Sequence, residues 1–372
     1  MKFVHLSDTH LGWRELHHTD EEGRNLRELD VYDAFARAID RAIELEPAVV
    51  IHSGDLFHGY HPSSAALAVA LDQIGRLRAA GIEFVVIAGN HETPRARAIA
   101  HPFSLLERFG VNAVHEEPRR LCFGDLAVTA VPHSNDREQM AAWVAASDPD
   151  PEARFNVLVA HLGLEGLPRV GAGEPGATEL PGELLEQVAD FDYIALGHLH
   201  QFDRPRLNAV YAGSLEPLTW ADRAARKGLV EADLAAKPLD MAFLTLHEIE
   251  GRPRKRLPPI DASKVDDLTK AIVRLAKKGG VEGAIVRVPI ANVSFEKFGA
   301  LDRRKVGEAF AAALHLELEP AFVEPGTGAP QPAAPPELRD FLAKRVPAGV
   351  EPQVFITRGE TYMTRAAEDI GA

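Results

Sequence analysis

Five stretches of this chain share one layout, in which a short apolar run rich in β-branched residues ends in Asp, Asn or His. The run Val49-Val50-Ile51 leads to Gly54-Asp55, and similar runs end at Asp8 and His10, Asn90 and His91, His161, and His198 and His200. Such runs are typical of buried parallel strands. Because the carboxyl ends of parallel strands meet at one edge of a sheet, we expect these side chains to gather there.

The order of predicted elements indicates an α/β sandwich over residues 1–249. Apolar spacing predicts helices over 28–45, 63–80 and 102–109, and a fourth helix that contains Trp143. The expected strands are 2–7, 48–53, 83–88, 111–115, 126–131, 155–160, 191–196, 209–212, 228–234 and 241–249. Residues 163–182 are rich in Gly and Pro and are expected to form a long loop.

Beyond residue 249 the sequence pattern predicts a smaller domain, a linker and a tail. A boundary is expected in 250–260, which holds Pro258-Pro259. A helix at 263–278, a strand at 284–290, a helix at 302–314 and a strand near 315–323 predict a small α/β cap over 250–324. Residues 325–336 contain five prolines (325, 330, 332, 335 and 336) and read as a linker. The tail 337–372 is expected to form one or two short helices that dock onto a partner.

Composition excludes several classes of protein. The 372 residues contain no run of about 18 apolar residues, and Met1-Lys2-Phe3 enters a strand directly, so we expect a cytoplasmic protein without a membrane span. Cys122 is the only cysteine, which excludes an internal disulfide and a cysteine-based zinc site, and it is expected to be a buried structural thiol. The net charge of −14 argues against a broadly basic nucleic-acid coat but permits DNA contact through one face or through bound cations.

The residues at the strand ends are suited to hydrolysis of phosphate esters. Two cations about 3.5–4 Å apart generate hydroxide at neutral pH and neutralise the charge that develops on the ester. Such a site needs one carboxylate that touches both ions, and Asp55 has the central place in the series. The proposed ligands are Asp8, His10, Asp55, Asn90, His161, His198 and His200. Imidazole and carboxylate without thiolate favour Mn²⁺, with Fe²⁺ or Zn²⁺ as alternatives.

Two further histidines have expected roles beside the metal ligands. His91 follows a proposed ligand and is positioned to protonate the leaving oxygen. His58 follows Asp55 by three residues and is expected to orient substrate or support the acid. The remaining histidines outside this series are expected to be core or surface residues.

Other motifs carry weaker signals. The basic run, whose charged members are Arg252, Arg254, Lys255 and Arg256, is either a solvated linker or a patch that contacts the DNA backbone. The stretch 171–176 matches G-x-G-x-x-G, but no strand precedes it and a proline interrupts it, so we reject a dinucleotide site. No G-x-x-x-x-G-K-[ST] motif occurs, and any ATPase must therefore belong to a partner.

The motifs D-x-H, G-D, G-N-H, H and G-H-x-H occur in the order found in the calcineurin-like metallophosphoesterase superfamily. The stretches Ser7 to Gly12, Gly54 to His58 and Gly197 to His200 further resemble the SbcD-type DNA repair nucleases, the counterparts of the meiotic-recombination-eleven nuclease. The resemblance is strong over about 1–235 and looser over the cap. Glu92 stands where the family commonly has Asp.

The resemblance implies a metallophosphoesterase β-sandwich flanked by helices, with a capping DNA-binding domain. It implies that one ion binds Asp8, His10, Asp55 and His200, and that the other binds Asp55, Asn90, His161 and His198. His91 would be the proton donor and His58 its supporting histidine. The implied activity is manganese-dependent cleavage of DNA, exonucleolytic on ends and endonucleolytic on single strands or hairpins, during double-strand-break repair.

The resemblance also implies partners. These are a second copy of the chain, bound through the helices near 63–80 and 102–109, and an SbcC-type coiled-coil ATPase, bound by the tail. Two other functions remain open at this point. One is a phosphatase or phosphodiesterase that acts on small phosphoesters, which the acidic net charge favours mildly. The other is a non-catalytic scaffold, which would be expected to lack a ligand.

Overall fold

The computed structural model describes residues 1–96, 99–166, 178–236, 243–323, 346 and 351–358. Two mixed sheets lie within the first 250 residues. The six-stranded sheet has the order β13-β12-β1-β2-β3-β4, and the five-stranded sheet has the order β11-β10-β7-β6-β5. In the first sheet, β1, β2, β3 and β4 run parallel, as do β6, β7, β10 and β11 in the second. These parallel blocks supply the strand ends that the sequence predicted.

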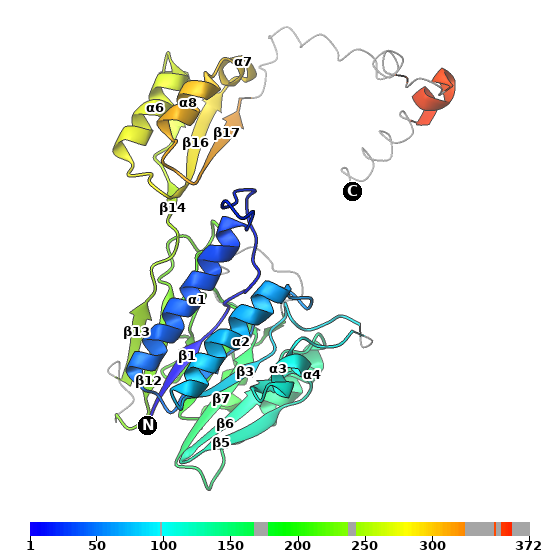
Figure 1. The fold of residues 1–372 in the computed structure, drawn as a ribbon, viewed down its shortest axis with the longest axis vertical. Helices are drawn as coiled ribbons and strands as arrows, with labels where there is room; N and C mark the ends of the chain where they lie inside the picture. Colours follow the sequence, from blue (N-terminus) through cyan, green and yellow to red (C-terminus); the bar gives the residue numbers. More distant parts are fainter. Residues whose placement is uncertain (97–98, 167–177, 237–242, 324–345, 347–350, 359–372) are drawn as a thin grey trace. The chain divides into compact units, whose positions relative to one another are not determined.

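The strands of the first sheet are β1 (Lys2–Leu6), β2 (Val49–His52), β3 (Glu83–Ile87), β4 (Asn112–Val114), β12 (Gly228–Asp233) and β13 (Leu244–Glu248). Those of the second are β5 (Arg119–Phe123), β6 (Leu126–Val131), β7 (Phe155–His161), β10 (Tyr193–Gly197) and β11 (Ala209–Tyr211). The helices are α1 (Leu26–Leu45), α2 (Ser64–Ala79), α3 (Phe103–Arg108), α4 (Arg137–Ala145) and α5 (Leu184–Gln187). Figure 1 shows α1 and α2 side by side along the first sheet.

The two sheets pack face to face because alternate residues of each strand point to opposite sides. In β2, Val49 and Ile51 enter the core between the sheets, whereas Val50 packs in the core under α1 and α2. The outer face of the second sheet is covered by apolar residues of α4 and α5. The central strands of each sheet are therefore buried on both faces, whereas the edge strands β5 and β13 are partly exposed. The predicted α/β sandwich is confirmed as four layers.

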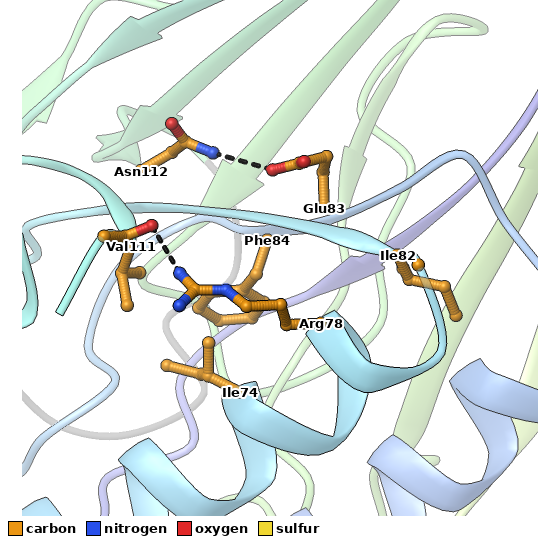
Figure 2. A pocket seen from close by; sticks show the side chains of 9 residues that line it. Ile74, Arg78, Ile82, Glu83, Phe84, Val111 and Asn112 are labelled. Atoms are coloured by element: carbon orange, nitrogen blue, oxygen red, sulfur yellow. Dashed lines mark hydrogen bonds between the residues drawn. The ribbon is translucent and has the colours of Figure 1, made fainter.

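Helix ends are fixed by local signals. Asn25 caps α1 by accepting hydrogen bonds from the amides of Arg27 and Glu28, and Ser63 caps α2. At the other end of α2, Arg78 donates to the carbonyls of Phe109 and Gly110. Figure 2 shows the guanidinium of Arg78 pointing toward the segment that carries Val111. This contact attaches α2 to the turn that follows α3.

Several elements differ from the prediction. Strand β5 was missed because its alternating polar and apolar residues lie at the edge of a sheet, and Cys122 on it is exposed rather than buried. The stretch 163–182 contains the paired two-residue strands β8 (Gly163–Leu164) and β9 (Glu179–Leu180), and the G-x-G-x-x-G match at 171–176 lies outside the described residues. The short helix α5 was also missed.

The chain divides into two compact units. The first comprises 1–258, 269–289 and 302–319, and the second comprises 259–268, 290–301 and 320–372. Beyond residue 250 the elements are β14 (Arg254–Arg256), β15 (Ile260–Asp261), a 3₁₀ helix (Ala262–Lys264), α6 (Leu268–Lys278), β16 (Ile285–Val293), α7 (Phe295–Gly299), α8 (Arg303–Ala309) and β17 (His315–Phe322). Strands β14, β15, β16 and β17 form one sheet.

Within 250–324 the sequence predicted α6, β16, α8 and β17, but it did not predict the other elements. The basic run forms β14 rather than a linker, β15 and α7 were missed, and α8 ends at Ala309 instead of near residue 314. The boundary at 249/250 remains a prediction. The linker 325–336 lies outside the described residues, and in the tail the described residues 352–358 are helical. No helix among the described residues has the length and hydropathy needed to cross a membrane.

Candidate metal centre

The seven predicted ligands come together at the carboxyl edge of the two sheets. Three groups of side chains could each hold an ion, with their ligand atoms within 4.8 Å of one another: Asp8, His10 and His200; Asp8, Asp55 and His161; and His10, His58 and His91. Asn90 joins them through its side-chain oxygen, which lies 2.9 Å from His161 Nε2 and 3.3 Å from His198 Nδ1. The division of the ligands between two ions remains a prediction.

Asp55 occupies the centre of this cluster. Its Oδ1 accepts a hydrogen bond from the amide of His91 (3.0 Å). Its Oδ2 is fully buried, has no hydrogen-bond partner among the described residues, and lies 3.4 Å from His161 Nε2 and 3.6 Å from His10 Nε2. A buried carboxylate oxygen that accepts no hydrogen bond costs about 1–3 kcal/mol or more. A bound cation would satisfy it, so the donor set fits a metal.

Hydrogen bonds fix which ring nitrogen faces the centre. His161 Nδ1 lies 2.9 Å from the carbonyl of Ser53, so it carries the proton and leaves Nε2 free to ligate. His10 Nδ1 lies 3.2 Å from His58 Nδ1, and its Nε2 lies 3.1 Å from His200 Nε2. Two imidazole nitrogens that converge at this distance are arranged for a shared cation.

Burial and the neighbouring charges shift the pKa values of the clustered carboxylates and imidazoles in opposite directions. Burial raises the pKa of the Asp8 carboxyl to about 6, although neighbouring histidines oppose the shift. Burial alone would lower the pKa of His161, but Asp55 and Asp8 raise it to about 9. In the same cluster the neighbouring histidines hold the pKa of the Asp55 carboxyl well below its usual range, so the buried carboxylates and imidazoles are strongly coupled to one another.

Glycines in three motifs allow the strand ends to approach one another. A Cβ on Gly54 would lie 2.3 Å from His161 Nδ1, one on Gly89 would lie 2.2 Å from Asp55 Oδ1, and one on Gly197 would lie 2.1 Å from the carbonyl of Ser53. These distances are far below van der Waals contact. The glycines are required by the packing of one loop against the next.

His91 and His58 lie on the open side of the centre, and both are partly exposed. His91 Nδ1 lies 3.1 Å from the carbonyl of His58, and its Nε2 lies 3.9 Å from Asp55 Oδ2. The His58 ring lies 4.9 Å from that of His91 and packs edge-on against Trp13 at 4.5 Å. Both rings are thus held beside the proposed ligands, as the sequence predicted.

Glu92 has a role that its place in the G-N-H motif does not indicate. It is fully buried, and its two oxygens accept hydrogen bonds from the amides of Phe57 (2.8 Å) and Gly89 (3.0 Å). It therefore joins the loop that carries Asp55 to the loop that carries Asn90. The signal available in sequence was only its position after the G-N-H histidine.

The basic run is not free for DNA in the way the sequence suggested. Arg252 makes a two-point ion pair with Asp30, and Arg254 is buried against Glu15 and the carbonyl of Pro217. Lys255 donates to the carbonyl of Gly280. Arg256, which is more exposed, pairs with Glu319 at 2.7 Å. The buried guanidinium of Arg254 thus has a structural role in place of the predicted DNA contact.

The fold and this centre define a class of protein. The family model for calcineurin-like phosphoesterases matches residues 1–202, more than half of the chain. The chain belongs to that family, whose members use a dinuclear metal centre. The predicted superfamily is confirmed.

The chain is also similar in sequence to particular members of this family. The chain is 34% identical over 201 residues to the DNA double-strand break repair protein Mre11 of Sulfurisphaera tokodaii, covering 54% of this chain and 49% of the relative. It is 29% identical over 301 residues to the protein of that name from Methanocaldococcus jannaschii, covering 77% of each. The chain thus spans about half the length of the first relative.

Among solved structures, a dimetal phosphatase from Danio rerio matches 62% of this chain and 92% of its own, with a TM-score of 0.37 and 14% identity.

Proposed function

We propose that this protein is the nuclease of a DNA double-strand-break repair system, cleaving DNA ends exonucleolytically and single strands or hairpins endonucleolytically. The observation that carries the proposal is the gathering of seven ligand side chains around the buried Asp55 Oδ2, in a chain similar to proteins named Mre11. The D-x-H to G-H-x-H series supports a complete centre, which argues against a non-catalytic scaffold.

The chemistry follows from the site. Two bound ions would supply a metal-activated water and neutralise charge on the phosphate. Asp8, His10, Asp55 and His200 would hold one ion, and Asp55, Asn90, His161 and His198 the other. The His91 Nδ1–H is held by the carbonyl of His58, so a second proton on Nε2 faces the cluster for transfer to the leaving oxygen. His58 supports the acid and orients His10 through its Nδ1.

The test is Mn²⁺-dependent degradation of end-labelled double-stranded DNA, with His91→Ala as the variant and His247→Ala, a histidine of β13, as the control. We expect cleavage by the parent and the control, and loss of at least about 100-fold in His91→Ala, the low end for general acid catalysis. Metal binding should persist in His91→Ala. Equal cleavage by His91→Ala would remove His91 from the mechanism.

A second candidate is a phosphodiesterase or phosphatase that acts on small phosphoesters. The net charge of −14 favours it, because a broadly acidic protein repels DNA. The same assay with a chromogenic phosphodiester separates the two candidates. Rapid turnover of the small ester with inert DNA would select the second function.

The metal is proposed to be Mn²⁺, because the donors are imidazoles, carboxylates and one amide oxygen without thiolate. Fe²⁺ and Zn²⁺ accept the same donors. Chelation followed by titration with each ion separately, read by DNA cleavage, distinguishes them. Higher activity with Fe²⁺ or Zn²⁺ than with Mn²⁺ would contradict the choice.

A homodimer is proposed through the surface of α2 and α3. Leu105 and Phe109 are exposed at 38% and 55%, and the carbonyl of Phe109 accepts a hydrogen bond from Arg78 of α2. Sedimentation should give a dimer for the parent chain and a monomer for the double variant Leu105→Glu with Phe109→Glu. A monomeric parent would contradict the proposal.

An SbcC-type ATPase is proposed as partner of the tail 337–372, and the cytoplasm as location. The resemblance to the SbcD-type nucleases is the support for the ATPase as a partner. Removal of residues 337–372 should abolish co-purification with the ATPase and leave Mn²⁺ binding unchanged.

For DNA contact we retain Arg252, Lys255 and Arg256 as candidates. The variant Arg256→Ala should reduce the affinity for DNA and the salt dependence of DNA binding.

A further inference from the structure

One ligand of the centre is in contact with a buried pair of charges that none of the five motifs contains. Asp222 lies in the loop between β11 and β12, and Lys227 lies just before β12. Their side chains are exposed by only 1% and 4%, and Lys227 Nζ lies 3.2 Å from Asp222 Oδ2. A buried pair of this kind is retained by a fold at considerable desolvation cost, so its partners are informative.

Both charges are directed at His200. Asp222 Oδ2 lies 3.6 Å from His200 Nδ1, on the side of the ring opposite to Nε2, which meets His10 at 3.1 Å. Lys227 Nζ donates to the carbonyl of His200 and to Ser214 Oγ. The amide of Ser214 donates to the same carbonyl, at 3.2 Å. The ring and the backbone of His200 are therefore held from one side.

The carboxylate itself is held rigidly. The amides of Leu218 and Thr219 donate to Asp222 at 3.1 and 2.8 Å, and Thr219 Oγ1 donates at 3.2 Å. With Lys227, these donors fix the Asp222 oxygens against rotation. A histidine that ligates through Nε2 needs its Nδ1–H oriented, and a carboxylate is a frequent partner for that proton.

We propose that Asp222, held by Lys227, is a positioning residue that fixes the tautomer and orientation of His200 for metal binding. The inference rests on the proposed two-ion site. Asp222 is not one of the proposed ligands, and it acts through the ring of His200. Partners of this kind typically change metal affinity about 10- to 100-fold when they are removed.

The test uses the full chain with Mn²⁺ alone, measured by calorimetry, for the parent, Asp222→Asn and Glu216→Gln. Glu216 is a matched control, because it is a buried carboxylate of the same loop that pairs with Arg27 at 2.6 Å. We expect Asp222→Asn to weaken one of the two Mn²⁺ ions about 10- to 100-fold and leave the other unchanged. Glu216→Gln should lower stability while both affinities stay at the parent values.

The electron paramagnetic resonance of Mn²⁺ gives an independent signature. At two equivalents, the parent should show a spin-coupled pair, and Asp222→Asn should show the six-line spectrum of an isolated ion. If Asp222→Asn binds both ions with parent affinity, Asp222 is only a structural residue and the inference fails. If the parent binds no second ion, the proposed function fails instead, and the two failures are distinct.

A measurement on the unmodified chain covers the case in which Asp222→Asn does not fold. Long-range ¹H–¹⁵N spectra of histidine-labelled, metal-free protein report the tautomer of each ring. The inference predicts a proton on Nδ1 of His200, whose signal is assigned with His200→Gln. The opposite neutral tautomer, with the proton on Nε2 alone, would overturn it.

Discussion

Four proposed ligands have a backbone conformation that L-residues rarely adopt. The φ angles of Asp8, His10, Asp55 and His198 are 50°, 52°, 55° and 102°. A non-glycine residue in such a region costs about 1–3 kcal/mol. The cost arises because each strand must turn sharply where it ends, so that its side chain reaches the centre. Strain at these positions is therefore a property of the site.

The strain at His198 can be measured directly by comparing two variants. His198→Ala and His198→Gly both remove the ligand, but only glycine tolerates a φ of 102° without a Cβ clash. We expect the metal-free His198→Gly protein to be more stable than His198→Ala by about 1 kcal/mol, measured by urea denaturation. Equal or lower stability of the glycine variant would show that the backbone is unstrained here.

The glycines of the motifs provide a second prediction at this scale. In Gly89→Ala the new Cβ would lie 2.2 Å from Asp55 Oδ1 and 2.4 Å from the Asp55 amide, so the loop must shift. We expect at least a tenfold loss of Mn²⁺ affinity in calorimetry. Gly59→Ala is the control, because no atom lies within 4 Å of its Cβ. If Gly89→Ala binds Mn²⁺ with the affinity of the parent, the loops can shift to accept the new Cβ without displacing the ligands.

At the scale of elements, Glu92 ties together the loops that follow β2 and β3. In Glu92→Gln an NH₂ group replaces one carboxylate oxygen and faces the N–H of Phe57 or Gly89. Because both groups are donors, one buried backbone N–H loses its acceptor. The expected loss in the free energy of unfolding is about 1–3 kcal/mol. Glu92→Asp, with a shorter reach, should lose one of the two bonds. Unchanged denaturation midpoints in both variants would contradict this role.

The start of α3 predicts a dependence of stability on pH. His101 Nδ1 accepts a hydrogen bond from the amide of Phe103, and burial, with help from His115, lowers the pKa of His101 to about 3. The unfolded chain, with a pKa near 6.5, binds more protons between pH 6.5 and 3. The free energy of unfolding should therefore fall as the pH falls through this window.

We expect His101 to account for about 2 kcal/mol of the loss in stability between pH 7 and pH 5. The variant His101→Asn keeps an acceptor near the Phe103 amide but cannot take up a proton. Urea denaturation at both pH values should give a smaller loss for this variant than for the parent chain. An equal loss in both would show that His101 titrates normally in the folded protein.

The elements that build the centre were predictable because they depend on local pattern. Buried parallel strands such as β2 and β3 are continuous apolar runs, and the residues after them must meet at one edge. Edge strand β5 was not predictable in that way, because its outer residues face solvent and Cys122 is among them. In the basic run, charge alone gave no sign that Arg254 would be buried.

The same distinction applies to the site. The ligands lie in motifs at strand ends, where spacing along the chain is informative. Asp222 and Lys227 contact His200 from more than 20 residues away along the chain, and Glu92 contacts backbone amides. None of these contacts has a sequence signature. Tertiary packing sets these contacts, and only the three-dimensional structure brings them into view.

At the scale of the whole molecule, a cation should contribute to the stability of the entire sandwich. The centre joins loops from both sheets, and it buries Asp8 and Asp55 at 0% exposure. Because folding assembles the ligands, ions that bind only the folded chain stabilise it by RT ln(1 + [L]/Kd), about 2.7 kcal/mol per site at 100 times Kd. Thermal unfolding with Mn²⁺ and with a chelator measures this directly. We expect a higher Tm with Mn²⁺ for the parent, and almost none of that increase for Asp55→Asn, which loses the charge shared by both proposed ions. The same increase in Asp55→Asn would show that Mn²⁺ stabilises the fold somewhere other than at this centre.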